Sequence, residues 1–100
     1  MYSLSPSQAA ALRNAHFIAE DPASHDYDHI GMCTDVLELS SYIAELCEHV
    51  HTDVAPSTVQ AVTLATVLQQ SRSWWSVQHQ TLKQTLATLG TEARRLRLLS

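Results

Sequence analysis

Apolar residues recur at intervals of three and four through most of this chain, the spacing that places side chains on one face of an α-helix. The clearest line consists of Met32, Val36, Leu39, Ile43, Leu46 and Val50. A smaller and more polar line, about 100° further around the same axis, consists of Cys33, Leu37, Ser40, Ala44, Cys47 and His51. A helix that is apolar on two adjoining faces needs more than one neighbour. We therefore expect a helix over about 28–51 at the centre of the fold.

The segment 57–89 contains a third line with the same spacing: Leu64, Leu68, Ser71, Trp75, Gln78 or His79, Leu82, Leu86 and Leu89. From residue 32 to residue 89 the chain has no glycine, and Pro56 is its only proline. Because glycine and proline are the usual helix breakers, the pattern predicts one break near 52–57. A single helix over about 57–89 is then expected to follow.

Such a helix would be about 48 Å long at about 1.5 Å per residue. A compact domain of this chain length has a diameter of about 34 Å, so the helix would extend beyond its own globule. A second copy of the chain can cover the overhang, or the helix can kink and bend back at the serines of segment 71–76. We favour a homodimer, because a dimer of elongated helical hairpins covers both long helices together.

The start of the chain predicts a shorter helix. Ser5 has the character of an N-cap, and Pro6 suits the first helical position, where a missing amide hydrogen is harmless. A helix over about 6–19, rich in small residues, follows. The polar segment 20–28 is predicted to be a loop, with Asp26 or Asp28 as the N-cap of the next helix.

At the other end of the chain, Gly90 is predicted to end the long helix as its C-terminal cap, leaving a short basic tail over 91–100. The predicted fold class is all-α, in one helical domain over 1–100. We expect a short N-terminal helix to lie across an antiparallel hairpin of two long helices. We expect the apolar lines to join two copies in an elongated dimeric helical bundle.

The formal charge of −4 conceals a division along the chain. Residues 1–60 hold nine acids and a single basic residue, Arg13, a net charge of −8. Residues 61–100 hold five basic residues and one acid, Glu92, a net charge of +4. Packing the acidic helix against the basic segment within one molecule explains this division most simply, and an antiparallel dimer or a charged partner is the alternative.

The composition favours a cytoplasmic protein. The chain has no apolar run of about 20 residues and no basic-then-apolar leader. Cys33 and Cys47 are about 21 Å apart along one predicted helix, so they cannot bridge each other within it. Reduced, buried cysteines are typical of cytoplasmic proteins.

One cluster contains residue types that bind metals: His25, Asp26, Asp28 and His29. Two histidines four residues apart share a face if the segment is helical. Aspartate and histidine are just as common for structural reasons, as helix starts and loop residues. We therefore expect no metal, no cofactor and no enzymatic activity. A metal-dependent hydrolase built on this cluster is kept as an alternative.

The basic tail offers a second alternative. Arg94, Arg95 and Arg97 could contact nucleic acid or an anionic membrane. Docking of the tail on the acidic helix explains these three arginines more simply, so we expect neither partner.

The function that the sequence favours is binding of another protein. Tryptophan is enriched at binding hot spots, and the expected interface consists of Trp74, Trp75, Leu68, Leu82, Met32, Val36, Leu39 and Ile43. We expect a small cytoplasmic regulator, adaptor or antiactivator that presents helical surfaces as a homodimer. An acidic secretion-type chaperone is the alternative within the same class.

Overall fold

A computed structural model describes residues 4–21, 23, 28–70 and 76–99, with the backbone alone for residues 76–78. This part of the chain contains four helices and no strand: α1 (Pro6–Glu20), α2 (His29–His49), α3 (Pro56–Gln70) and α4 (Ser76–Leu99). The predicted all-α class is confirmed. The radius of gyration of the Cα atoms is 13.0 Å, and the principal extents are 38 × 24 × 20 Å.

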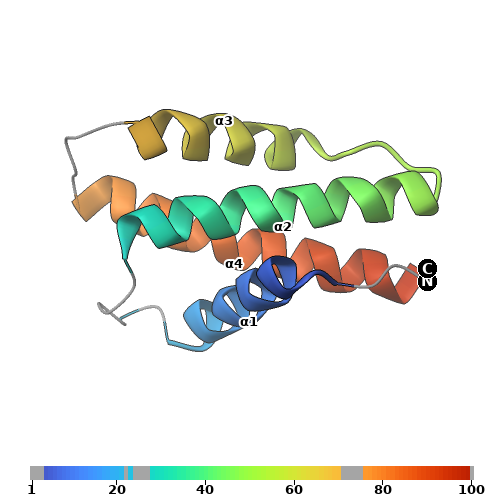
Figure 1. Cartoon of the computed structure of the whole chain (residues 1–100), viewed down its shortest axis with the longest axis horizontal. Helices are drawn as coiled ribbons and strands as arrows, with labels where there is room; N and C mark the ends of the chain where they lie inside the picture. Colours follow the sequence, from blue (N-terminus) through green and yellow to red (C-terminus); the bar gives the residue numbers. More distant parts are fainter. Residues whose placement is uncertain (1–3, 22, 24–27, 71–75, 100) are drawn as a thin grey trace.

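Helix α2 lies at the centre, as its two apolar faces predicted. It packs against α1, α3 and α4, whereas α3 has little contact with α4 (Figure 1). Both lines contribute to the core, whose fully buried members on α2 include Met32, Cys33, Val36, Leu39 and Ile43. The hydroxyl of Ser40 donates to the carbonyl of Val36 at 2.7 Å, which satisfies this polar group inside the core.

The expected single helix over 57–89 is replaced by two helices. Figure 1 shows α3 and α4 running in opposite directions, with α2 between them along most of its length. A straight helix of about 48 Å would exceed the 38 Å longest extent of the molecule. Folding back lets both segments cover α2. A kink at the serines of segment 71–76 was the alternative to a continuous helix, and residues 71–75 of that segment lie outside the described residues.

Gly90 does not end a helix, contrary to the prediction. It lies buried within α4, which runs on to Leu99 and includes most of the expected tail. A Cβ atom added to Gly90 would be 2.8 Å from the Cβ of Ala15, closer than real side chains approach. Glycine inside a helix is unfavourable by about 1 kcal/mol relative to alanine. Here it permits the close approach of α1 and α4.

The helix starts agree with local sequence chemistry. The Ser5 hydroxyl accepts from the amide of Gln8 at 3.1 Å, and the Gln8 side chain accepts from the amide of Ser5 at 3.1 Å, a capping box. Asp28 caps α2 by accepting from the amide of Gly31 at 3.3 Å. Both expected N-caps are therefore present, because capping depends on residues only two or three positions apart.

Candidate functional site

Most of the expected interface residues lie inside the chain's own core. Six of them are at most 3% exposed: Leu68, Leu82, Met32, Val36, Leu39 and Ile43. These side chains pack between helices of a single chain, so a dimer that keeps this fold must use other residues. The remaining two, Trp74 and Trp75, lie outside the described residues, and their role stays a prediction.

The metal-ligand cluster does not come together in the part that the structure describes. His25 and Asp26 lie outside it, and Asp28 is occupied as an N-cap. Across residues 4–21, 23, 28–70 and 76–99, no three His, Cys, Asp or Glu side chains are grouped as metal ligands.

His29 has a structural position at the start of α2. Its Nε2 lies 3.2 Å from the carbonyl oxygen of Leu68, near the end of α3. Burial and, to a smaller extent, charge repulsion from His79 lower the pKa of His29 to about 4, against the opposing effect of Asp28. The imidazole is therefore neutral near pH 7, and Nε2, facing a carbonyl, carries the proton and donates it. This contact joins the start of α2 to α3.

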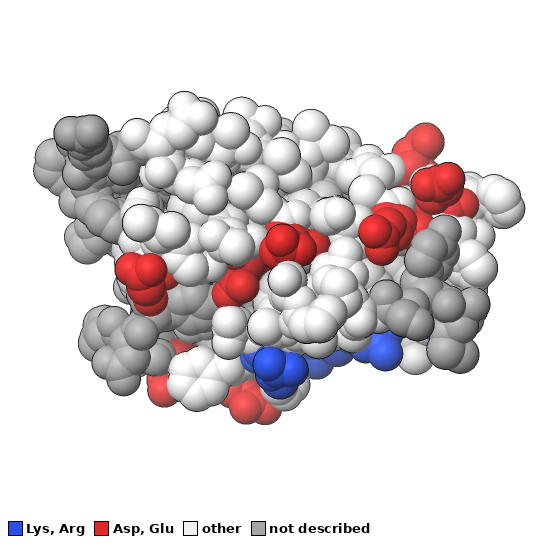
Figure 2. All heavy atoms as spheres, in the orientation of Figure 1, with Lys and Arg blue, Asp and Glu red and all other residues white. Residues whose placement is uncertain are grey.

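An uncharged surface covers the outer side of α3. The helix has no charged residue, and Val59, Val62 and Val67 are 56%, 37% and 61% exposed. In Figure 2 the region over α3 shows no acidic or basic side chain, whereas acidic side chains follow α2. The hydroxyls of Thr63 and Thr66 donate to backbone carbonyls of α3 at 3.2 and 2.8 Å, so these donors are satisfied within the helix.

A shallow groove of about 450 Å³ continues this surface toward α2. Its lining consists of Leu37, Ser40, Ser41, Ala44, Val54, Thr58, Val59, Val62 and Thr63. No charged residue is among them. We call the exposed face of α3 together with this groove the valine surface.

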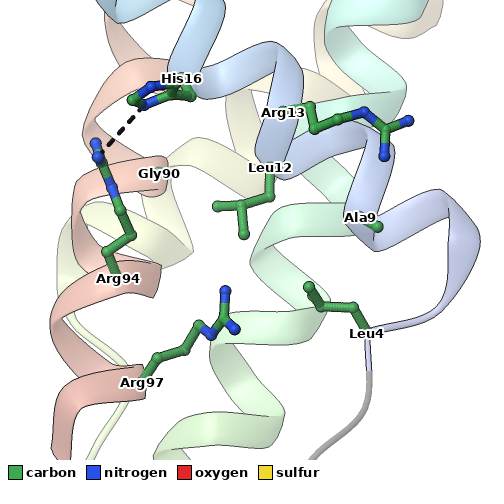
Figure 3. Close-up of a pocket in the computed structure, with 8 residues that line it drawn as sticks. All are labelled: Leu4, Ala9, Leu12, Arg13, His16, Gly90, Arg94 and Arg97. Carbon is green, nitrogen blue, oxygen red and sulfur yellow. Dashed lines mark hydrogen bonds between the residues drawn. The ribbon is translucent and has the colours of Figure 1, made fainter.

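A second groove, of about 360 Å³, lies between α1 and α4. Its lining consists of Leu4, Ala9, Leu12, Arg13, His16, Gly90, Arg94 and Arg97. Figure 3 shows Arg94 and Arg97 extending from α4 beside Leu12, whereas the side chain of Arg13 extends from α1 away from α4. We call it the arginine groove.

A chain of hydrogen bonds runs along one edge of the arginine groove. Nη1 of Arg94 lies 3.4 Å from Nδ1 of His16, and Nε2 of His16 lies 3.0 Å from a carboxylate oxygen of Glu20. Because a guanidinium can only donate, Nδ1 of His16 accepts in this arrangement. The proton of the neutral ring is then on Nε2, which donates to Glu20.

The three arginines of the expected tail separate into two groups. Arg94 and Arg97 line the arginine groove beside α1. Arg95 is turned elsewhere and donates to both carboxylate oxygens of Glu92, at 2.6 and 3.0 Å. These hydrogen bonds lower the pKa of Glu92.

Sequence reasoning missed the arginine groove. The spacing of Arg94 and Arg97 indicates that they share a helix face, but nothing local places Arg13 in the same groove. It also did not predict that Tyr42 and Lys83 are buried, each with 1% of its surface exposed. The two cysteines are buried and not bonded to each other, and burial raises the pKa of both thiols.

Comparisons with protein-family models, with curated proteins and with solved structures give no match for this chain. Among the helices within the described ranges, none combines the length and the apolar character needed to cross a membrane.

Proposed function

We propose that this chain is a small protein–protein interaction module, a regulator, adaptor or antiactivator, that forms a homodimer through the valine surface. The observation that carries the proposal is that α3 combines three exposed valines with a complete absence of charge. Apolar surface next to a groove without charged residues is typical of sites that bind helices. Buried, reduced Cys33 and Cys47 fit a cytoplasmic location for this activity.

The distribution of charge favours a second copy of the chain as the partner that covers the valine surface. Two chains that each carry a formal charge of −4 repel each other where their acidic side chains meet. The acids on α2 are Asp35, Glu38, Glu45 and Glu48. Helix α3 lets two copies approach without bringing charges together. A two-fold axis would place the two copies of α3 side by side, each covering the valines of the other.

The area available on the valine surface is compatible with a stable dimer. A standard interface buries about 800 Å² on each partner. The molecule exposes 6090 Å², so the dimer would cover about an eighth of that surface. The length of α3, about 22 Å at about 1.5 Å per residue, together with the groove beside it, supports an interface of this order.

Sedimentation equilibrium over a series of protein concentrations tests the proposal. The wild-type chain is expected to dimerise, and Val62→Asp to shift the equilibrium to monomer, because dimerisation would bury its carboxylate without a partner. Thr88→Asp, on the exposed side of α4, is the matched control and should dimerise like the wild type. Circular dichroism checks that each variant is folded.

Two results would contradict the proposal. A wild-type chain that stays monomeric at the highest attainable concentration would remove the homodimer. A Val62→Asp variant that dimerises as strongly as Thr88→Asp would show that the valine surface is not the interface.

A further inference from the structure

We propose that α3 pairs with α3 of a second copy in the antiparallel direction, with Val62 of each copy opposite Thr66 of the other. This inference rests on the proposed function and deepens it, because it assigns the direction and the register in which the second copy covers the valine surface. It names the two side chains at the centre of the contact between the copies.

A line of uncharged side chains runs along the side of α3 that its own chain leaves uncovered. It consists of Val59, Val62, Thr66 and Gln69, which are all exposed. At about 100° per residue, these positions lie within about 80° of one another around the helix axis. Figure 1 shows α3 at one edge of the molecule. Intervals of three and four residues let two helices pack their side chains into each other's gaps, so this side of α3 has the pattern of a pairing helix.

The intervals along this line are the same in both directions. From Val59 to Gln69 they are three, four and three residues. A two-fold axis perpendicular to α3 reverses the second copy, so the line meets its own pattern. Val62 then lies opposite Thr66, and Val59 lies opposite Gln69. The axis passes midway between Val62 and Thr66, close to the middle of α3, so the two helices overlap along most of their length.

The groove beside α3 favours antiparallel over parallel pairing. It lies along one side of the line, between Val59 and Val62 of α3 and Leu37 and Ala44 of α2. A perpendicular two-fold axis leaves the two grooves on the same side of the helix pair, where the two copies cover them together. In a parallel pair the axis runs along α3, and the grooves would lie on opposite sides. Antiparallel pairing also places the positive end of each α3 dipole beside the negative end of the other.

The central contact joins two β-branched side chains. Val62 is 37% exposed. The hydroxyl of Thr66 donates to the carbonyl of Val62 in its own helix at 2.8 Å, which satisfies the donor and fixes the rotamer. Because β-branched side chains have few χ1 rotamers in a helix, ordering them at an interface costs little conformational entropy. The contact buries apolar atoms without burying a charge.

Disulfide cross-linking tests the direction and the register. A chain with Val62→Cys is mixed with a tagged chain with Thr66→Cys, the subunits are allowed to exchange, and mild oxidation is followed on a non-reducing gel. The mixed dimer should cross-link fastest. Either variant alone should cross-link about tenfold more slowly, because two identical cysteines would be about 6 Å apart along the helix axis in addition to the spacing between the helices.

A second pair of variants checks the register at the ends of α3. Val59→Cys mixed with Gln69→Cys should also form a mixed disulfide. Neither should link to itself, because identical cysteines at these positions would be about 15 Å apart along the axis.

Thr88→Cys, on the exposed side of α4, is the matched control for random collisions and should cross-link more slowly than the mixed pairs. Cys33 and Cys47 are buried, so the wild-type chain should give no linked dimer under the same oxidation. Circular dichroism checks that each variant is folded, and sedimentation equilibrium checks that it still dimerises.

The outcomes separate this proposal from the homodimer itself. Fast linkage of Val62→Cys and of Thr66→Cys each with itself would mean parallel pairing and would overturn the inference. Mixed pairs that link no faster than Thr88→Cys would overturn the register. Both results leave the homodimer in place if the wild-type chain dimerises and Val62→Asp does not. A wild-type chain that stays monomeric would remove both proposals.

Discussion

The two sides of α2 are covered in different ways. On one side α1 and α4 approach each other closely at Ala15 and Gly90, and their longer side chains form the arginine groove. On the other side α3 packs mainly on α2 and has little contact with α4, with buried alanines facing inward and valines facing outward. One side carries two arginines of α4 beside an apolar groove, and the other offers apolar surface without charge. The lining of the first groove therefore includes charged side chains, and the lining of the second does not.

Truncating a buried leucine should lower the free energy of unfolding more on the α4 side of α2 than on the α3 side. Leu86 on α4 is fully buried, and Leu86→Ala is expected to lower the free energy of unfolding by about 3–5 kcal/mol through lost transfer energy and a cavity. Leu68→Ala on α3 should cost less, about 2–3 kcal/mol, because α3 has fewer neighbours and can relax into the space. Urea denaturation measures both values. Equal losses would show that the two sides are equally constrained.

Acid should loosen the contact between α2 and α3. The pKa of His29 is about 4 in the folded chain and ordinarily near 6.5, so the unfolded chain binds a proton more readily between these values. The stability from neutral His29 is therefore complete above about pH 6.5 and is lost as the pH falls, by about 3 kcal/mol at pH 4. Urea denaturation at a series of pH values measures the loss.

His29→Gln is the control for this pH dependence. Its stability should fall less steeply between pH 7 and pH 4, because glutamine does not titrate. The raised pKa of Asp35, which is caused by burial and opposed by a hydrogen bond from Asn14, acts in the other direction and is present in both proteins. Identical pH profiles for the two proteins would show that His29 does not carry the effect.

The close approach of α1 and α4 should be sensitive to one methyl group. Gly90→Ala adds a Cβ atom 2.8 Å from that of Ala15, and the repulsion should outweigh the gain of about 1 kcal/mol in helix propensity. We expect a net loss of about 1–2 kcal/mol in thermal or chemical denaturation. Thr88→Ala, on the exposed side of α4, should be neutral or stabilising. A stabilised Gly90→Ala variant would mean that the helices separate easily.

The smallest expected effect concerns the start of α1. Ser5→Ala removes the hydroxyl that accepts from the amide of Gln8, and it should lower the free energy of unfolding by about 1 kcal/mol. Ser5→Asp keeps an acceptor at the N-cap and should restore most of that loss. If Ser5→Ala and Ser5→Asp were equally destabilised, the capping box would not account for the effect.

The sequence by itself determined the helical class, the N-cap at Ser5 and the central position of α2, and it restricted the N-cap of α2 to Asp26 or Asp28. These features depend on residues within a turn or two of each other, through hydrogen bonding at helix starts and apolar spacing along a helix face. Apolar spacing gave a wrong prediction after Gln70: the unbroken apolar line predicted a single helix over about 57–89, and the fold has two helices there.

Only the tertiary structure decided how distant segments meet. Whether the buried lines of α2 are covered by the chain's own helices or by a second copy depends on the direction of α4 after α3, which the spacing of apolar residues does not encode. Ala15 meets Gly90, and Arg13 and Arg94 line the same groove, although each pair is far apart in sequence. Both candidate surfaces arise from such meetings, because packing decides which side chains remain exposed once the core is filled.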